Sequence, residues 1–251
     1  MSDSGLLSRG FRELREDWNA DNINTSAANG VAWLVSSDSS DTAFVRTASA
    51  AGIIVTATTA ATDDNMCEIG HDTLAWSVQN GALYMEGRCR LDVITNVAFN
   101  IGFNDDQLDD SNTLPMELSG TTWTSNAASW IGFVFDTDAT NDDVHVMWVD
   151  DDNDSGEAVA DLRMSGLAPV ANEWFSWSIL LTDRGSGNGV RAEFNIVEES
   201  TGKRMQKAFN TTLDRDVLLT PHIAVENRSA TAHVFDIDAG LYVKASRATT
   251  N

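Results

Sequence analysis

One acidic segment has the residue types and the spacing of a calcium-binding loop. Asp150, Asp152 and Asp154 stand at its first, third and fifth positions, and Asp161 stands at the twelfth. Calcium prefers hard oxygen ligands, which an EF-hand loop presents at these positions. Ser155 replaces the usual glycine, however, an aspartate replaces the final glutamate, and strand-like sequence flanks the segment. We interpret it as a solvated acidic hairpin turn and expect no metal or other cofactor.

The remaining metal-ligating residue types are scattered. A second acidic loop, over residues 136–143, is a weaker candidate for the same cation. A zinc site needs four converging ligands, and no histidine stands at short spacing from a cysteine or another histidine. We therefore interpret the histidines as isolated side chains, and both cysteines as small buried hydrophobic residues rather than a disulfide. These residues are His71, His145, His222, His233, Cys67 and Cys89.

The eight tryptophans are the natural candidates for sugar binding, because an indole ring can pack against a pyranose ring. Trp174 and Trp177 are three residues apart on one predicted strand, so they point to opposite faces and one of them belongs to the core. Trp123 lies in the polar segment 119–125 and is the best exposed candidate. Four others stand inside apolar runs and are predicted core residues: Trp33, Trp76, Trp130 and Trp148.

The first sixteen residues differ in texture from the rest of the chain. Apolar residues recur there at helix-like spacing, with arginines between them. Two interpretations stay open: an arm that docks on a partner, or a short helix or irregular segment that closes one end of the domain. On the first interpretation, residues 1–16 form the arm and residues 17–251 form one domain, with these partner-binding candidates: Leu6, Leu7, Arg9, Phe11, Arg12 and Leu14.

From residue 17 onward the hydrophobic pattern has a period of two. The segment 82–91 alternates over ten residues, and the segments 97–103 and 129–135 are short apolar runs of similar texture. Runs rich in Val, Ile, Phe and Trp, separated by Asp, Asn, Ser and Gly, are typical of strands. A parallel α/β fold would need helical crossovers, which the sequence lacks. We predict a single antiparallel β-sandwich.

Composition excludes several classes of function. The chain of 251 residues carries 38 acidic and 16 basic residues, a formal net charge of −22, and residues 91–162 contain no Lys or Arg. Such a chain lacks the basic face that binding to nucleic acid or to an anionic membrane requires. The longest apolar runs are only a few residues long, which argues against a transmembrane helix. The first residues lack a signal-peptide pattern. An Asp-rich, Lys-poor chain is typical of saline settings, and plain solubility is an equally good explanation of this composition.

The order of elements resembles the concanavalin A-like (laminin-G-like) jelly roll. The resemblance covers about residues 17–245 and depends on the strand-like segments 81–90, 100–105, 130–136, 172–179 and 236–243. In texture the chain is similar to the lectin-like structural proteins of tailed phages. That resemblance implies a virion protein that decorates or cements the capsid surface. Its expected partners are the major capsid protein and further copies of itself, as a dimer or trimer.

Two other functions are alternatives to the virion role. One is a carbohydrate-binding, lectin-like module that attaches to a surface glycan of a host. The other is glycoside hydrolysis, which needs two carboxylates about 5–10 Å apart. The Glu-x-Asp-x-x-Glu motif of retaining enzymes with this fold is absent, and the nearest pairs are Glu193 with Glu198 and Asp236 with Asp238. The glycine-rich segment 184–189 is a predicted hairpin turn. We therefore expect no enzymatic activity.

Overall fold

A computed structural model describes most of the chain. It describes residues 11–19, 23–24, 32–38, 43–50, 52–72, 74–79, 81–108, 113–154, 166–238 and 241–246. All regular secondary-structure elements in these residues are β-strands. The described residues contain no helix with the length and hydropathy that a membrane crossing requires.

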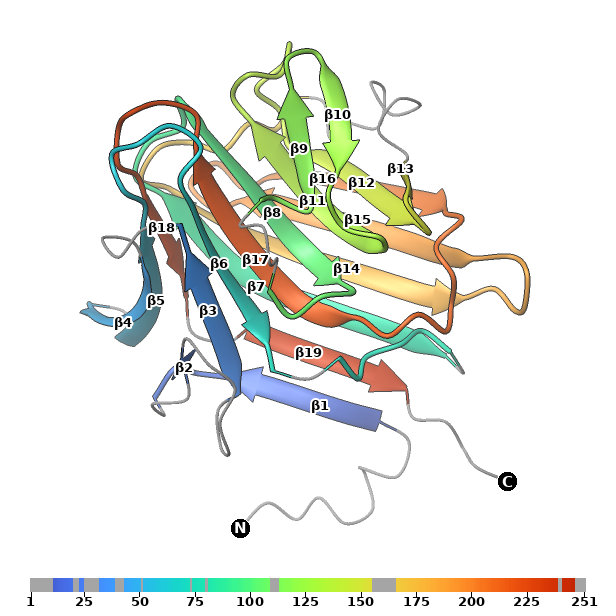
Figure 1. Cartoon of the computed structure of the whole chain (residues 1–251). Helices are drawn as coiled ribbons and strands as arrows, with labels where there is room; N and C mark the ends of the chain where they lie inside the picture. Colours follow the sequence, from blue (N-terminus) through green and yellow to red (C-terminus); the bar gives the residue numbers. More distant parts are fainter. Residues whose placement is uncertain are drawn as a thin grey trace.

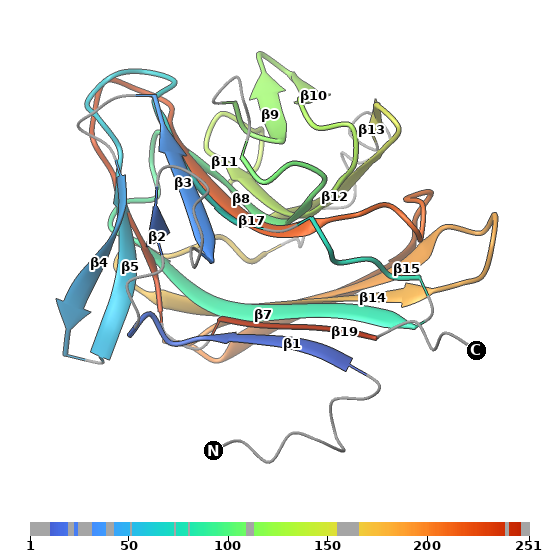
Figure 2. The same cartoon turned by 60° about the horizontal axis from the view of Figure 1, so that its bottom comes forward.

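The larger of two stacked sheets contains nine strands within the described residues (Figures 1 and 2). All of its strand pairs are antiparallel. β18 and β19 pair with the same side of β7, and β1 extends the sheet beyond β19. In order these strands are β16 (Lys203–Asn210), β15 (Val190–Glu198), β14 (Trp174–Asp183), β7 (Ala82–Leu91), β18 (Val234–Ile237), β5 (Gly52–Thr58) and β4 (Ala43–Ser49), with β19 (Leu241–Ser246) and β1 (Phe11–Glu16).

The smaller sheet contains eight strands within the same residues, and a separate hairpin lies against its outer side (Figure 2). Its pairs are antiparallel except for β2 with β3. In order its strands are β13 (Asn153–Asp154), β12 (His145–Asp150), β11 (Trp130–Asp136), β8 (Val97–Asn104), β17 (Thr220–Asn227), β6 (Met66–His71), β3 (Trp33–Ser37) and β2 (Ile23–Asn24); the hairpin is β9 (Met116–Ser119) and β10 (Thr122–Ser125).

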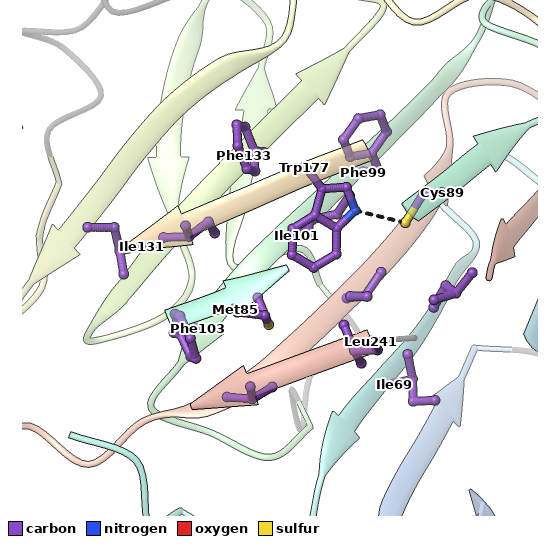
Figure 3. Packing of buried hydrophobic residues seen from close by; sticks show 14 of the residues in the cluster. Ile69, Met85, Cys89, Phe99, Ile101, Phe103, Ile131, Phe133, Trp177 and Leu241 are labelled. Carbon is purple, nitrogen blue, oxygen red and sulfur yellow. Dashed lines mark hydrogen bonds between the residues drawn. The ribbon is translucent and has the colours of Figure 1, made fainter. Parts of the chain in front are cut away.

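The main core lies between the two sheets. Alternate residues of facing strands fill it, as Figure 3 shows for Ile101 of β8 and Met85 of β7. Trp177 is buried and donates a hydrogen bond from Nε1 to the sulfur of Cys89 at 3.2 Å. Burial raises the pKa of the Cys89 thiol, so this cysteine stays protonated. Both cysteines are buried and free, as predicted from their apolar surroundings.

The sandwich confirms the all-β prediction from the period-two pattern. Trp177 and Trp174 do point to opposite faces: Trp177 is in the core, whereas Trp174 lies on the outer side of the larger sheet between Arg88 and Arg90. The segment 184–189 joins β14 to β15 as the predicted hairpin turn. The helix-like spacing near the N-terminus is misleading for residues 11–16, because they form the edge strand β1 paired with β19.

Candidate functional site

The outer face of the smaller sheet is covered rather than open. The β9–β10 hairpin packs its apolar side on this face, and Leu114 packs beside it with residues of β6, β8 and β17. The result is a second apolar cluster outside the main core. It consists of Met116, Leu118, Trp123, Ala127, Trp130, Val134, Met147 and Val149.

The segment that follows β8 approaches the sheet closely at Gly70. Gly132, Gly102, His222 and Gly70 are cross-strand neighbours on β11, β8, β17 and β6. A Cβ atom on Gly70 would stand only 1.7 Å from the backbone oxygen of Gln107. Glycine is therefore required at position 70 for the segment that follows β8 to lie on the sheet.

A polar pair is enclosed under this cover. Nε2 of His222 lies 2.9 Å from Oε2 of Glu68, and both side chains have an exposed fraction of 0%. A general acid or base must reach its substrate. In this conformation the pair is a buried structural contact.

Arg228 organises a buried ion cluster at one end of the covered face. Its guanidinium lies 2.5 Å from Asp136 of β11 and 2.6 Å from Glu226 of β17. Glu117 of β9 and Asp64 lie further away, at 3.5 Å and 3.7 Å. Burial raises the pKa of Glu226 to about 8, although the positive charge of Arg228 acts in the opposite direction. One arginine thus connects the hairpin to the end of β11.

An open hollow lies between the hairpin and the loop that follows β11. Its volume is about 330 Å³, which is within the range of small-ligand pockets. The indole of Trp123 and the imidazole of His145 form its aromatic part, with ring centroids 5.2 Å apart and planes at 56°. The other lining residues are Leu118, Gly120, Thr121, Thr122, Asp138, Ala139, Thr140 and Asn141.

Local sequence explains both walls of this hollow. The hairpin turns at Gly120, whose φ of 63° is readily adopted only by glycine. On the opposite wall, the backbone N–H of Asp138 donates a hydrogen bond to the Asp136 carboxylate at 2.9 Å, an Asx turn. Because Asp136 also binds Arg228, the loop carrying Asp138 and Asn141 is tied to the buried cluster. The polar side chains Thr121, Asp138 and Asn141 remain exposed.

The prediction of an exposed Trp123 in a polar loop is wrong about both the exposure and the element. The residue lines the hollow, but it stands on strand β10 and not in a loop, and only 9% of its surface is exposed. It packs on the second apolar cluster, which the sequence pattern did not reveal. The sequence did not indicate a sugar-binding role for three other lining residues, Asp138, Asn141 and His145. The polar composition of 136–143 is the available signal, although by itself it fits a weak cation-binding loop equally well.

Three of the six partner-binding candidates are described by the structure, and Leu6, Leu7 and Arg9 lie outside the described residues. Phe11 begins strand β1. Arg12 donates a hydrogen bond to the Ala75 carbonyl at 3.2 Å and lies 4.4 Å above the Trp76 ring. Leu14 packs against the main core. Arg12 and Leu14 thus contribute to the sandwich itself, and partner binding by the arm stays a prediction.

The carboxylates considered for calcium and for hydrolysis lie in separate places. Asp150 and Asp154 flank the turn between β12 and β13, where Asp151 and Asp152 have φ of 50° and 61°. This is the hairpin turn expected at 150–154, and Asp161 lies outside the described residues. The hydrolysis candidates Asp236 and Asp238 form ion pairs with Arg90 and Arg88 on the larger sheet. Glu193 pairs with Arg191, and Glu198 binds the adjacent Ser200 and Thr201.

Comparison with known proteins places the architecture. Lectin I from Ulex europaeus, in complex with the methyl glycoside of α-L-fucose, has a TM-score of 0.59 and 8% identity, with 94% of this chain and 98% of that chain covered. Peanut lectin with a 9mer peptide has a TM-score of 0.58 and 9% identity, with 95% and 99% covered. This chain has the concanavalin A-like fold of the lectins. No family model and no curated protein matches the sequence.

The same fold also occurs in an enzyme. The marine PL-14 alginate lyase from Aplysia kurodai has a TM-score of 0.54 and 6% identity, with 81% of this chain and 87% of that chain covered. At such identities the similarity concerns the fold alone, because one architecture supports many functions. The residues that line the chain's own hollow are therefore the evidence for its function.

Proposed function

We propose that this protein is a non-catalytic carbohydrate-binding module whose ligand occupies the hollow beside Trp123. The observation that carries the proposal is the composition of this hollow, in which two largely buried aromatic rings line the same space as exposed carboxylate, amide and hydroxyl groups. The lectin-like fold supports it.

The side chains are suited to hold a sugar ring in one orientation. The C–H groups of a pyranose pack favourably on the accessible part of the Trp123 and His145 rings. Sugar hydroxyls donate to the carboxylate of Asp138, and the amide of Asn141 both donates and accepts. Hydrogen bonds to a charged acceptor are the stronger of these contacts.

The test is a glycan array followed by calorimetry on the best ligand. Asn141 is exposed and lines the hollow, so Asn141→Ala should lower affinity about tenfold without unfolding the protein. Asn210→Ala, an exposed asparagine of β16 on the other sheet, is the matched control and should bind as the wild type does. Failure of the wild type to bind any glycan, or equal affinity of the Asn141 variant, would contradict the proposal.

The virion role expected from the sequence has less support. None of the proteins named above is a virion protein, and the first part of the expected arm lies outside the described residues. Binding to a capsid protein and self-association stay predictions. A module that binds a host glycan is compatible with a position on a virion or elsewhere, so the hollow is the feature to test first.

A further inference from the structure

The hollow has an uneven charge distribution. Asp138 is the one carboxylate among the side chains that line it, and no lining side chain is a lysine or an arginine, within the part of the chain that the structure describes. The wall around it belongs to the sequence stretch 91–162, which contains sixteen acidic residues and no lysine or arginine. The local potential is therefore negative, and it adds to the net charge of −22.

Asp138 also differs from the carboxylates beside it. Asp136 is bound to Arg228, and Asp143 accepts a hydrogen bond from the backbone N–H of Gly166 at 2.9 Å. The carboxylate of Asp138 is exposed and makes no hydrogen bond or ion pair with the described residues. It is a charged acceptor that a ligand can use without displacing a protein partner.

We propose that the hollow selects a positively charged amino sugar, with a free amine paired to Asp138, over neutral and anionic sugars. This inference rests on the proposed function and specifies its ligand class. An ammonium group gains a charge-assisted hydrogen bond from the carboxylate and is attracted to the indole of Trp123. A uronate or a sulfated sugar would bring a second negative charge against Asp138 with no guanidinium or ammonium from a lining side chain to offset it.

The experiment compares four trisaccharides by calorimetry in mildly acidic buffer at low salt: glucosamine, N-acetylglucosamine, glucose and galacturonate. Short ligands limit unspecific attraction to the acidic surface. We expect the glucosamine trisaccharide to bind at least about tenfold more tightly than the neutral pair, and the galacturonate trisaccharide to bind most weakly. Added salt should reduce the preference for the charged amine.

Two variants locate the charge effect. Asp138→Asn should remove about tenfold of the affinity for the glucosamine trisaccharide and change the affinity for the neutral sugars less than about twofold. Asp63→Asn removes the same charge from an exposed position outside the hollow and should leave the preference intact. Equal binding of charged and neutral sugars, or an equal loss in both variants, overturns the inference but leaves the proposed function standing. Binding of no sugar overturns both.

Discussion

Individual charged residues decide how the candidate site is held together. Arg228 is 4% exposed and contacts carboxylates from β9, β11 and β17, so one guanidinium joins the hairpin wall and the loop wall of the hollow. Four carboxylates around one arginine leave excess negative charge, and a bound proton on Glu226 relieves it. The cluster therefore links protonation to the stability of the covered face.

Stability should fall as pH rises through the pKa of Glu226. The folded-state pKa of about 8 lies above the ordinary value of 4.5, so the folded protein holds this proton more tightly than the unfolded chain. The stabilisation is complete below pH 4.5, declines by up to about 1.4 kcal/mol per pH unit between pH 4.5 and pH 8, and is lost above pH 8. Asp105, with its pKa raised to about 6, acts in the same direction at lower pH.

Urea unfolding between about pH 6 and pH 9 measures this slope. Glu226→Gln keeps a neutral side chain of the same shape, so the variant should lose most of the slope between about pH 6 and pH 8. Glu173→Gln, at an exposed position, is the control and should keep it. An unchanged slope in the Glu226 variant would show that another group holds the proton.

Individual elements decide which surfaces of the sandwich are accessible. The β9–β10 hairpin and the segment after β8 close the outer face of the smaller sheet, and the hollow opens only at their margin. β1 is part of the larger sheet, and its Glu16 accepts hydrogen bonds from Trp18 and Trp33. A truncation that tests the arm should therefore end before β1, because removal of residues 11–16 would disturb the sandwich.

Gly70→Ala should show how tightly the cover is seated. The new methyl group would collide with the Gln107 backbone, which cannot move aside as a flexible side chain can, so we expect a loss of about 3 kcal/mol or more in unfolding free energy. Gly120→Ala has open space but a left-handed φ of 63°, and it should cost about 1 kcal/mol. Urea titrations of both variants provide the comparison. A cost at position 70 no greater than at position 120 would mean that the cover is loosely seated.

At the scale of the whole molecule, the net charge of −22 opposes the compact state. Added NaCl screens the repulsion, so raising it from about 0.05 M to 0.5 M at neutral pH should raise the Tm by several degrees. The same salt step near the sequence pI of about 4.2 should change the Tm little, because the net charge is then close to zero. Scanning calorimetry measures both. A Tm that falls with salt at neutral pH would show that ion pairs such as those of Arg228 outweigh the general repulsion.

The sequence by itself determined the class of fold and much of the core. A period of two, repeated in segments such as 82–91, places alternate side chains on opposite faces, so it identified strands and buried residues such as Cys89 without further information. The same logic failed for residues 11–16, because Phe11 and Leu14, together with Leu6 and Leu7, also fit helical spacing. Their pairing with β19, more than 220 residues away in the chain, made them a strand.

Only the tertiary structure decided where the candidate site is. Trp123 could be selected as a polar-segment tryptophan, but its neighbours Asp138 and His145 come from other elements that reach it through the packing of the hairpin on the sheet. The close approach at Gly70 and the Arg228 cluster arise in the same way, since β6, β8, β11 and β17 meet through long-range pairing. Local periodicity determines which face a residue points to, but only the three-dimensional arrangement determines what lies opposite that face.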